Sequence, residues 1–317
     1  MSAAAGSATT RVRLAVTLGD PRGVGPEIAA RAVRHLRSPD RHFTFVGPAG
    51  TGAEREADAF IAVGEWSPTG DPALAGRLAG RAIEQATGLA LAGDVDALVT
   101  APIDKYALHA GGYHFPGHTE LLAALARVDD VVMLMAAERT ALGAALRVVL
   151  ATTHLPLAEV PRRFTRALLE QQTRLTAAAL RTGWGIAAPR VALCAFNPHA
   201  SDGGLFGDEE ARIYAPALAA LRAEGIAASG PIPADTVFLR AGRGEFDAVI
   251  APYHDVGMAA FKTAAFGQGV NVTLGLPFVR TSPDHGTALD IAGRGLADDS
   301  SMREAIRLAH MLVSGRR

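Results

Sequence analysis

The sequence is short of several residue types, and each shortage excludes a class of protein. Its 317 residues include one cysteine, Cys194, which excludes an intrachain disulfide framework and a multi-cysteine zinc ribbon. The formal net charge of −1 at pH 7 argues against a nucleic-acid site that works by bulk positive charge. No apolar run approaches the roughly 18 residues that span a bilayer, and residues 1–10 lack the basic and apolar regions of a signal peptide. We therefore expect a cytoplasmic protein with no nucleic-acid or membrane partner.

Lysine is scarce as well. Of 31 basic residues only Lys105 and Lys262 are lysines, and the others are arginines. A lysine that persists in so arginine-rich a chain is a candidate for a chemical role. The sequence leaves the role of Lys105 open.

Apolar residues are abundant, and they alternate along the chain between short continuous runs and helical spacing. Hydrophobic residues make up 49% and charged residues 20% of the chain, as in globular proteins. Short apolar runs predict strands at 13–18, 42–47, 96–102, 131–136, 147–153, 190–197 and 246–253. Apolar residues at helical spacing predict helices at 26–37, 72–92, 165–182, 207–225 and 301–314. This alternation is typical of an α/β sandwich on a largely parallel sheet, and the length suggests two domains.

Most of the unusual polar residues directly follow these strands. In open α/β sheets, ligands bind at that edge. Seven segments carry the unusual polar residues, most of them directly after a predicted strand: GDPRGVGPE (19–27), TAPIDK (100–105), FPGHTE (115–120), TTHLPL (152–157), NPHASDGG (197–204), PYHDVG (252–257) and the long segment 269–295.

Three histidines lie at equivalent positions after predicted strands. His154, His199 and His254 could converge on one point and hold a divalent metal that keeps open positions for substrate. The alternative is that each is a separate histidine, hydrogen-bonded near its own strand end. Their wide separation in sequence leaves both interpretations open.

Several side chains that suit an anionic substrate lie in the other segments, namely His118, Thr119, Lys262, Asn271 and Arg280. Arginine can bind a phosphate or carboxylate with two hydrogen bonds, and lysine supplies a point charge. The alternative is that Arg280 caps a helix or pairs with Asp284, and that Lys262 is solvated.

Two carboxylates complete the ionisable set. Asp235 and Asp255 could accept the proton of a metal-bound alcohol, whereas Asp255 could instead orient the neighbouring His254. The turn at 19–27 lacks the spacing of the dinucleotide fingerprint, and no Walker-type G-K-[ST] occurs in the chain. A standard Rossmann domain and a P-loop nucleotidase are therefore disfavoured.

Two motifs at opposite ends of the chain resemble known enzymes. GDPRGVGPEI resembles the GDGIGPE turn of isocitrate and isopropylmalate dehydrogenases, and DHGTALDIAGRG resembles their HG[ST]APDIAGKG loop, which binds the adenosine part of NAD(P). The closer resemblance is to the 4-hydroxythreonine-4-phosphate dehydrogenase family of pyridoxal phosphate biosynthesis. It rests on VTAPIDK, FPGHTE, ATTHLPL, NPHASDGGLFGDEE, PADTVF, YHD and GVNVTLGLPFVRTSPDHGTALDIAGRG, which occur in that order.

This resemblance implies a fold and a domain plan. The fold is the isocitrate/isopropylmalate dehydrogenase-like one, with two α/β/α sandwich domains and the active site in the cleft between them. Residues 1–115 plus 285–317 would form the first domain, and residues 116–284 the inserted second domain with much of the metal and substrate site. A homodimer is implied, with the active site at the subunit interface and His254 contributed by the other subunit.

The resemblance also implies ligands and a reaction. His154, His199 and His254 would hold a divalent metal, zinc first and magnesium or cobalt as alternatives. The substrate would be bound by His118, Thr119, Lys262, Asn271 and Arg280. NAD, or NADP, would be bound by Asp284, His285, Gly286 and Thr287. With Asp235, Asp255 and Lys262 as catalytic candidates, 4-phosphohydroxy-L-threonine would be oxidised to a β-keto acid that decarboxylates to 3-amino-2-oxopropyl phosphate.

One departure from the family pattern leaves other substrates as alternatives. The family usually has Gln-Gly or Gln-Ala after YHD, whereas this chain has Val256-Gly257-Met258. Relatives oxidise 4-phosphothreonate, 4-phosphoerythronate or an aromatic cis-dihydrodiol dicarboxylate, and these remain alternatives. A phosphate acyltransferase of similar fold, or a ligand-binding relative without catalysis, are the alternatives from other classes.

Overall fold

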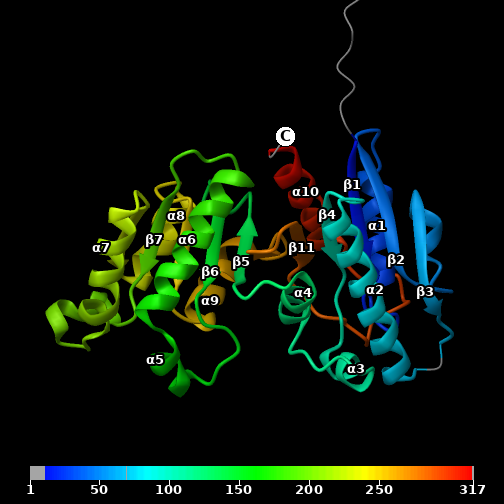
Figure 1. The fold of residues 1–317 in the computed structure, drawn as a ribbon, viewed down its shortest axis with the longest axis horizontal. Helices are drawn as coiled ribbons and strands as arrows, with labels where there is room; N and C mark the ends of the chain where they lie inside the picture. Colours follow the sequence, from blue (N-terminus) through cyan, green and yellow to red (C-terminus); the bar gives the residue numbers. More distant parts are fainter. Residues whose placement is uncertain (1–10, 69, 316–317) are drawn as a thin grey trace, which may run out of the picture. The chain divides into compact units, whose positions relative to one another are not determined.

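In a computed structural model, which describes residues 11–68 and 70–315, the chain divides into two compact units. The first contains residues 11–117 together with 285–314, and the second contains residues 118–284. Each unit has its own strands and helices (Figure 1). Among the described residues, no helix is both long enough and apolar enough to cross a membrane.

The first unit is built on parallel strands. Its elements are β1 (Val12–Thr17), α1 (Gly25–Leu36), β2 (Arg41–Ala49), η1 (Ala53–Glu56), β3 (Ala59–Glu65), α2 (Pro72–Ala92), β4 (Ala97–Thr100), α3 (Lys105–Ala110) and α10 (Ser300–Ser314). The strand order is β3-β2-β1-β4, and each neighbouring pair is parallel. The carboxyl ends of these strands therefore lie at one edge, where α1 begins after β1.

Local sequence explains where the helices begin and end. In α2 the Asp71 carboxylate accepts a hydrogen bond from Ala73 N (2.9 Å), Pro72 occupies the first turn, and Gly93 ends the helix at a φ of 75°. Helix α10 comes from the far end of the chain and packs against α1, β1 and β4. In Figure 1 the red α10 lies beside the blue α1.

The second unit contains the remaining elements. They are α4 (His118–Ala126), β5 (Val132–Ala137), β6 (Leu146–Leu150), η2 (Leu157–Glu159), α5 (Val160–Arg163), α6 (Arg166–Thr182), β7 (Arg190–Cys194), η3 (Pro198–Gly204), η4 (Glu210–Tyr214), α7 (Ala215–Ala223), β8 (Ala227–Ile232), α8 (Ala234–Gly242), β9 (Ala248–Ala251), α9 (His254–Ala265), β10 (Val270–Leu274) and β11 (Val279–Pro283). The strand order is β11-β10-β5-β6-β9-β7-β8. The strands β6, β9, β7 and β8 run parallel, whereas β11, β10, β5 and β6 pair antiparallel.

The prediction of a largely parallel sheet holds for most strand pairs, and β11, β10, β5 and β6 are the antiparallel exception. Segment 269–295 contains the hairpin β10–β11, which the sequence did not predict. The hairpin turn passes through Gly275 at a φ of 90°, where an added Cβ would lie 2.3 Å from the Asp130 carbonyl oxygen. Strands β3 and β8 and helices α3, α4 and α8 were not predicted either.

Cys194 ends β7 inside the core of the second unit. Its side chain packs among apolar residues of β6, β9 and α8. Burial raises the pKa of its thiol to about 12, so the group stays protonated near neutral pH and behaves as a small apolar side chain.

Candidate active site

Strands β10 and β11 present a polar face inside the second unit. Because Asn271 pairs with Ser282, the antiparallel register places Thr273 opposite Arg280, with all four side chains on the same face. The Arg280 side chain is buried (2% exposed) and donates to the Thr273 hydroxyl oxygen at 2.9 Å. Burial lowers the pKa of the guanidinium to about 9, so it still carries its charge at pH 7. A buried arginine on a polar face suits an anionic ligand.

Two other predicted substrate residues contribute buried polar atoms without partners. His118 begins α4, and its Nε2 atom is buried with no hydrogen-bond partner among the described residues; the same holds for Asn271 Oδ1. Burial, together with the charge of Arg280, lowers the pKa of His118 well below its usual value. Thr119 follows in the same turn of α4. Buried polar atoms are normally hydrogen-bonded, so these two atoms indicate a place for a polar ligand.

The lowered pKa of His118 predicts a pH effect on stability. Below about pH 6.5 the unfolded chain binds a proton at this histidine that the folded protein does not, so stability falls as pH falls, by up to about 1.4 kcal/mol per pH unit. We expect that the His118→Gln variant takes up about one proton fewer on unfolding, so that its free energy of unfolding depends less on pH. Urea unfolding at pH 5.0–7.0 checks it, and an unchanged slope in the variant would contradict the assignment.

Two of the three predicted metal ligands lie close together in one chain. His154 follows β6 and His254 begins α9 after β9, and these strands are parallel neighbours. Their side chains therefore leave the same edge of the sheet, and the ring centroids are 5.5 Å apart. Asp255 Oδ1 lies 2.7 Å from His254 Nδ1, which leaves His254 Nε2 for a ligand.

His199 leaves the same edge from the next strand along. It follows β7, which pairs with β9 on the side away from β6. Its backbone φ is 51°, and that of His154 is 47°; residues other than glycine adopt such values uncommonly. Among the described residues, no group of three or more His, Cys, Asp or Glu side chains is close enough to hold a metal ion. Each of three adjacent parallel strands is thus followed by one histidine, and two of these histidines, His154 and His254, are neighbours.

Lys262 makes an ion pair in the second unit. Its Nζ atom lies 2.5 Å from Asp284 Oδ2, and the Asp284 side chain is 5% exposed. Lys262 is therefore ion-paired, which corrects the alternative in which it is solvated. Asp235 lies in the first turn of α8, and no other candidate among the described residues makes a hydrogen bond or ion pair with it. Lys105 is exposed at the start of α3.

In the first unit, the turn that precedes α1 packs against two other predicted segments. Arg22 pairs with the buried Asp20 at 2.7 Å and lies 3.8 Å from Asp104. Val24 N donates to the Thr287 carbonyl oxygen at 2.9 Å. An added Cβ at Gly23 would lie 2.7 Å from that same oxygen, so this close approach requires glycine.

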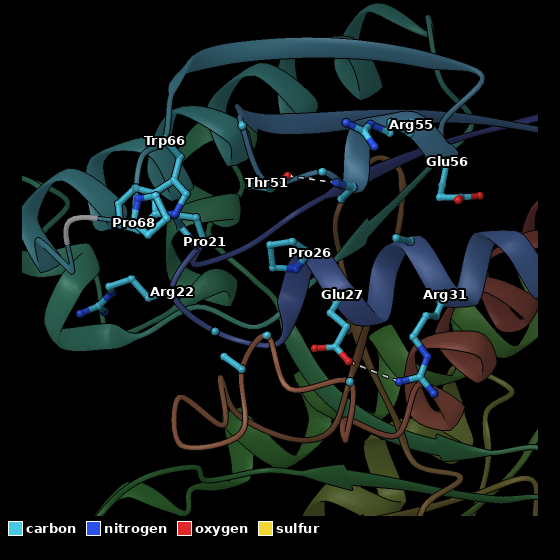
Figure 2. A pocket seen from close by; sticks show the side chains of 18 of the residues that line it. Pro21, Arg22, Pro26, Glu27, Arg31, Thr51, Arg55, Glu56, Trp66 and Pro68 are labelled. Carbon is cyan, nitrogen blue, oxygen red and sulfur yellow. Dashed lines mark hydrogen bonds and ion pairs between the residues drawn. The ribbon is translucent and has the colours of Figure 1, made fainter.

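A pocket of about 900 Å³ opens beside this turn. Figure 2 shows its lining from the start of α1, from η1 and from the segment that follows β3. The lining includes Trp66 and four arginines, Arg22, Arg31, Arg34 and Arg55. Arg31 pairs with Glu27 (3.4 Å), and Arg34 pairs with Glu56 (2.7 Å). An aromatic ring beside several guanidinium groups and a helix N-terminus suits a nucleotide with phosphates.

None of the predicted coenzyme residues is in the lining of this pocket, but Thr287 contacts the lining. The pocket is lined by Ala292, Gly293 and Gly295, whereas Thr287 packs against the lining residue Gly23. His285 is exposed, and its Nδ1 atom lies 3.0 Å from the Gly286 carbonyl oxygen.

Sequence reasoning missed the lining residues from η1 and from the segment after β3. No motif marks Arg55 or Trp66, and only the fold brings them to α1. Arg22 lies inside the GDPRGVGPE motif, so its positive charge could have identified it as a lining residue.

Comparison with known proteins places the chain in a family. The family described as "Pyridoxal phosphate biosynthetic protein PdxA" matches residues 29–309. This chain belongs to the PdxA family. A PdxA relative from Paracoccus denitrificans, named 4-hydroxythreonine-4-phosphate dehydrogenase, is 44% identical over 95% of this chain and 98% of its own length. A second relative, from Cupriavidus necator, is named D-threonate 4-phosphate dehydrogenase and is 40% identical over 96% of this chain and 98% of its own.

Solved structures agree with the PdxA assignment. The crystal structure of 4-hydroxythreonine-4-phosphate dehydrogenase from Klebsiella pneumoniae has a TM-score of 0.80 and 40% identity, covering 95% of this chain and 99% of that one. An isocitrate dehydrogenase from Methylococcus capsulatus shares the fold with a TM-score of 0.52 at 15% identity, covering 96% of this chain and 86% of that one. The predicted family and the predicted isocitrate dehydrogenase-like fold are confirmed.

Proposed function

We propose that this chain oxidises 4-phosphohydroxy-L-threonine with NAD, or NADP, and that the β-keto acid formed decarboxylates to 3-amino-2-oxopropyl phosphate, a step of vitamin B6 biosynthesis. The names of its relatives support the substrate class. The observation that carries the proposal is the buried, charged Arg280 beside unpartnered polar atoms of His118 and Asn271. These groups suit the negative charge and the hydrogen-bond donors of a phosphorylated hydroxy amino acid.

The histidines suit a divalent metal of zinc type. Imidazole nitrogen is a preferred zinc ligand, and three histidines leave one position of a tetrahedral site for substrate. His154 and His254 already lie close together, and Asp255 holds the second nitrogen of His254. We propose that His154, His199 and His254 hold this metal. When bound, it supplies positive charge that lowers the pKa of the substrate hydroxyl and stabilises the negative charge left by decarboxylation.

Residues of the chain would carry out proton transfer and substrate binding. Bound NAD, or NADP, would supply the acceptor for the hydride of the substrate carbon, a base of the chain would take the proton of the hydroxyl, and the carboxylate would then leave as CO2. Asp255 is engaged with His254, which favours an orienting role and leaves Asp235 and Lys262 as candidates for proton transfer. Arg280, His118, Thr119 and Asn271 would fix the substrate, and fixed orientation lowers the barrier of the chemical step.

For the coenzyme we propose the pocket of the first unit. The arginines and the start of α1 would bind the phosphates. Asp284, His285, Gly286 and Thr287 would contact the dinucleotide from the adjoining segment. A homodimer is part of the same proposal, on the ground of the family resemblance.

Gly23→Ala tests the coenzyme site. Its Cβ would overlap the Thr287 carbonyl oxygen, so the 285–295 segment must shift. We expect the KM for NAD to rise about tenfold, equivalent to about 1.4 kcal/mol, with little change in the KM for the phosphorylated substrate. Steady-state kinetics checks this. Gly88→Ala is a matched control, since an added Cβ at this glycine of α2 in the same unit meets nothing within 4 Å.

The decisive experiment for the function is a substrate comparison. NADH formation is measured with 4-phosphohydroxy-L-threonine, 4-phosphothreonate and 4-phosphoerythronate, each with and without a chelator. Chelator-sensitive turnover selective for the amino acid supports the proposal. Activity confined to a sugar acid would assign a catabolic role; the Cupriavidus relative is named for such a substrate, D-threonate 4-phosphate. No oxidation of any of the three would contradict a dehydrogenase function and favour a transferase or a binding protein.

A further inference from the structure

The turn that carries His199 has an unusual backbone. Five consecutive residues, 199–203, have φ values between 43° and 69°, and four of them are not glycine. L-residues adopt such values singly, and they persist only where surrounding groups determine the conformation. The question is which groups hold this turn.

Glu210 accepts the hydrogen bonds that hold this turn. Its Oε1 atom accepts hydrogen bonds from Phe196 N (2.9 Å) and Asn197 N (2.7 Å). Its Oε2 atom accepts from Asn197 Nδ2 (2.9 Å) and from the Ser201 hydroxyl. The side chain is buried (6% exposed). One carboxylate thus binds both sides of His199 through four hydrogen bonds.

The element that carries Glu210 is anchored to the same strand. Residues Glu210–Tyr214 form a π-helical turn, a rare geometry that is common at functional sites. At its other end the Tyr214 hydroxyl donates to the Cys194 carbonyl oxygen at 2.7 Å. The end of β7 and the turn after it are therefore held by one rigid segment.

We propose that Glu210 is a positioning residue that fixes His199 for metal binding. This inference rests on the proposed metal site. Glu210 touches none of the three histidines, and its effect passes through the backbone of the turn. The positive-φ run directs the His199 side chain, and without the four hydrogen bonds the turn would relax toward ordinary φ values.

Two Glu→Gln substitutions that each remove one negative charge distinguish a positioning role of Glu210 from a general effect of charge. Glu210→Gln keeps the size of the side chain, but its amide nitrogen cannot accept hydrogen bonds, so two of the four are lost. Glu209 also accepts from Asn197 Nδ2, at 2.7 Å, and Glu209→Gln can keep this bond through its amide oxygen while removing the same charge. Glu209→Gln is therefore the matched control.

The test measures zinc affinity by competition with a chelating dye and records the Co²⁺ absorption spectrum. We expect zinc to bind at least about tenfold more weakly to Glu210→Gln, with an altered Co²⁺ spectrum, and within about twofold of wild type for Glu209→Gln. Thermal unfolding of the metal-free proteins reports any purely structural loss. Should Glu210→Gln fail to fold, Ser201→Ala removes one of the four hydrogen bonds, and we expect a smaller weakening in the same direction.

The outcomes separate this proposal from the proposed function. If wild type binds zinc, His199→Ala abolishes the binding, and Glu210→Gln or Ser201→Ala binds zinc as wild type does, the positioning role is wrong while the metal site stands. If wild type binds no zinc, cobalt or magnesium, both are overturned.

Discussion

Replacing Arg280 with methionine is expected to lower kcat/KM for the phosphorylated substrate by about 100-fold or more. Charge-assisted hydrogen bonds contribute roughly 1.5–3 kcal/mol each, so losing two costs about 3 kcal/mol, which is about 100-fold. Most of the loss should be in KM, because a group remote from the reacting carbon binds the ground state and the transition state alike. Steady-state kinetics with 4-phosphohydroxy-L-threonine measures it.

The fold should tolerate this change. Methionine fills most of the volume of Arg280, so the variant should fold, with a lower free energy of unfolding because the hydrogen bond to Thr273 is lost. Arg147→Met is the control. Arg147 is also buried and pairs with Glu138 at 2.6 Å, so this variant should likewise be less stable, but with an unchanged substrate KM. An unaltered KM in Arg280→Met would contradict the anion site.

The second large effect is expected for His199→Ala. Removing one of three ligands should abolish metal binding and lower NADH formation on the order of 1,000-fold, since the metal contributes several kcal/mol to the proposed reaction. Alanine keeps the backbone, because Ala200 in the same turn already has a φ of 54°. Metal analysis of the purified variant and its turnover are measured together.

The control for His199→Ala is a histidine in the other unit. His114 is exposed, and its Nδ1 atom lies 3.0 Å from His109 Nε2. His114→Ala should keep both metal content and turnover. Normal turnover by His199→Ala would refute the assignment of the metal ligands.

Strand ends were the part of the site that the sequence could predict. Apolar runs located β6, β7 and β9, and a parallel sheet places the residues after them at one edge. The hairpin was missed because β10 and β11 turn polar side chains inward. Asn271 and Arg280 look like loop residues until the register places them on one buried face.

Ion pairing and backbone geometry lay beyond the sequence. Nothing in the spacing of the residues indicated that Asp284 pairs with Lys262, because 22 residues separate them in the chain. The positive φ values at His154 and His199 are likewise a result of packing around the strand ends. The pocket of the first unit includes Arg55 and Trp66, which only the path of the chain through β2 and β3 brings to α1.

Because the first unit is assembled from both ends of the chain, its folding order on the ribosome is constrained. Residues 118–284 are translated before α10. Until α10 has formed, the faces of α1, β1 and β4 that it covers have no partner, and α10 side chains such as Met302 and Ile306 are not yet buried. The unit whose strands come first in the sequence is therefore the last to close its core, and its apolar surface stays exposed throughout the synthesis of the second unit.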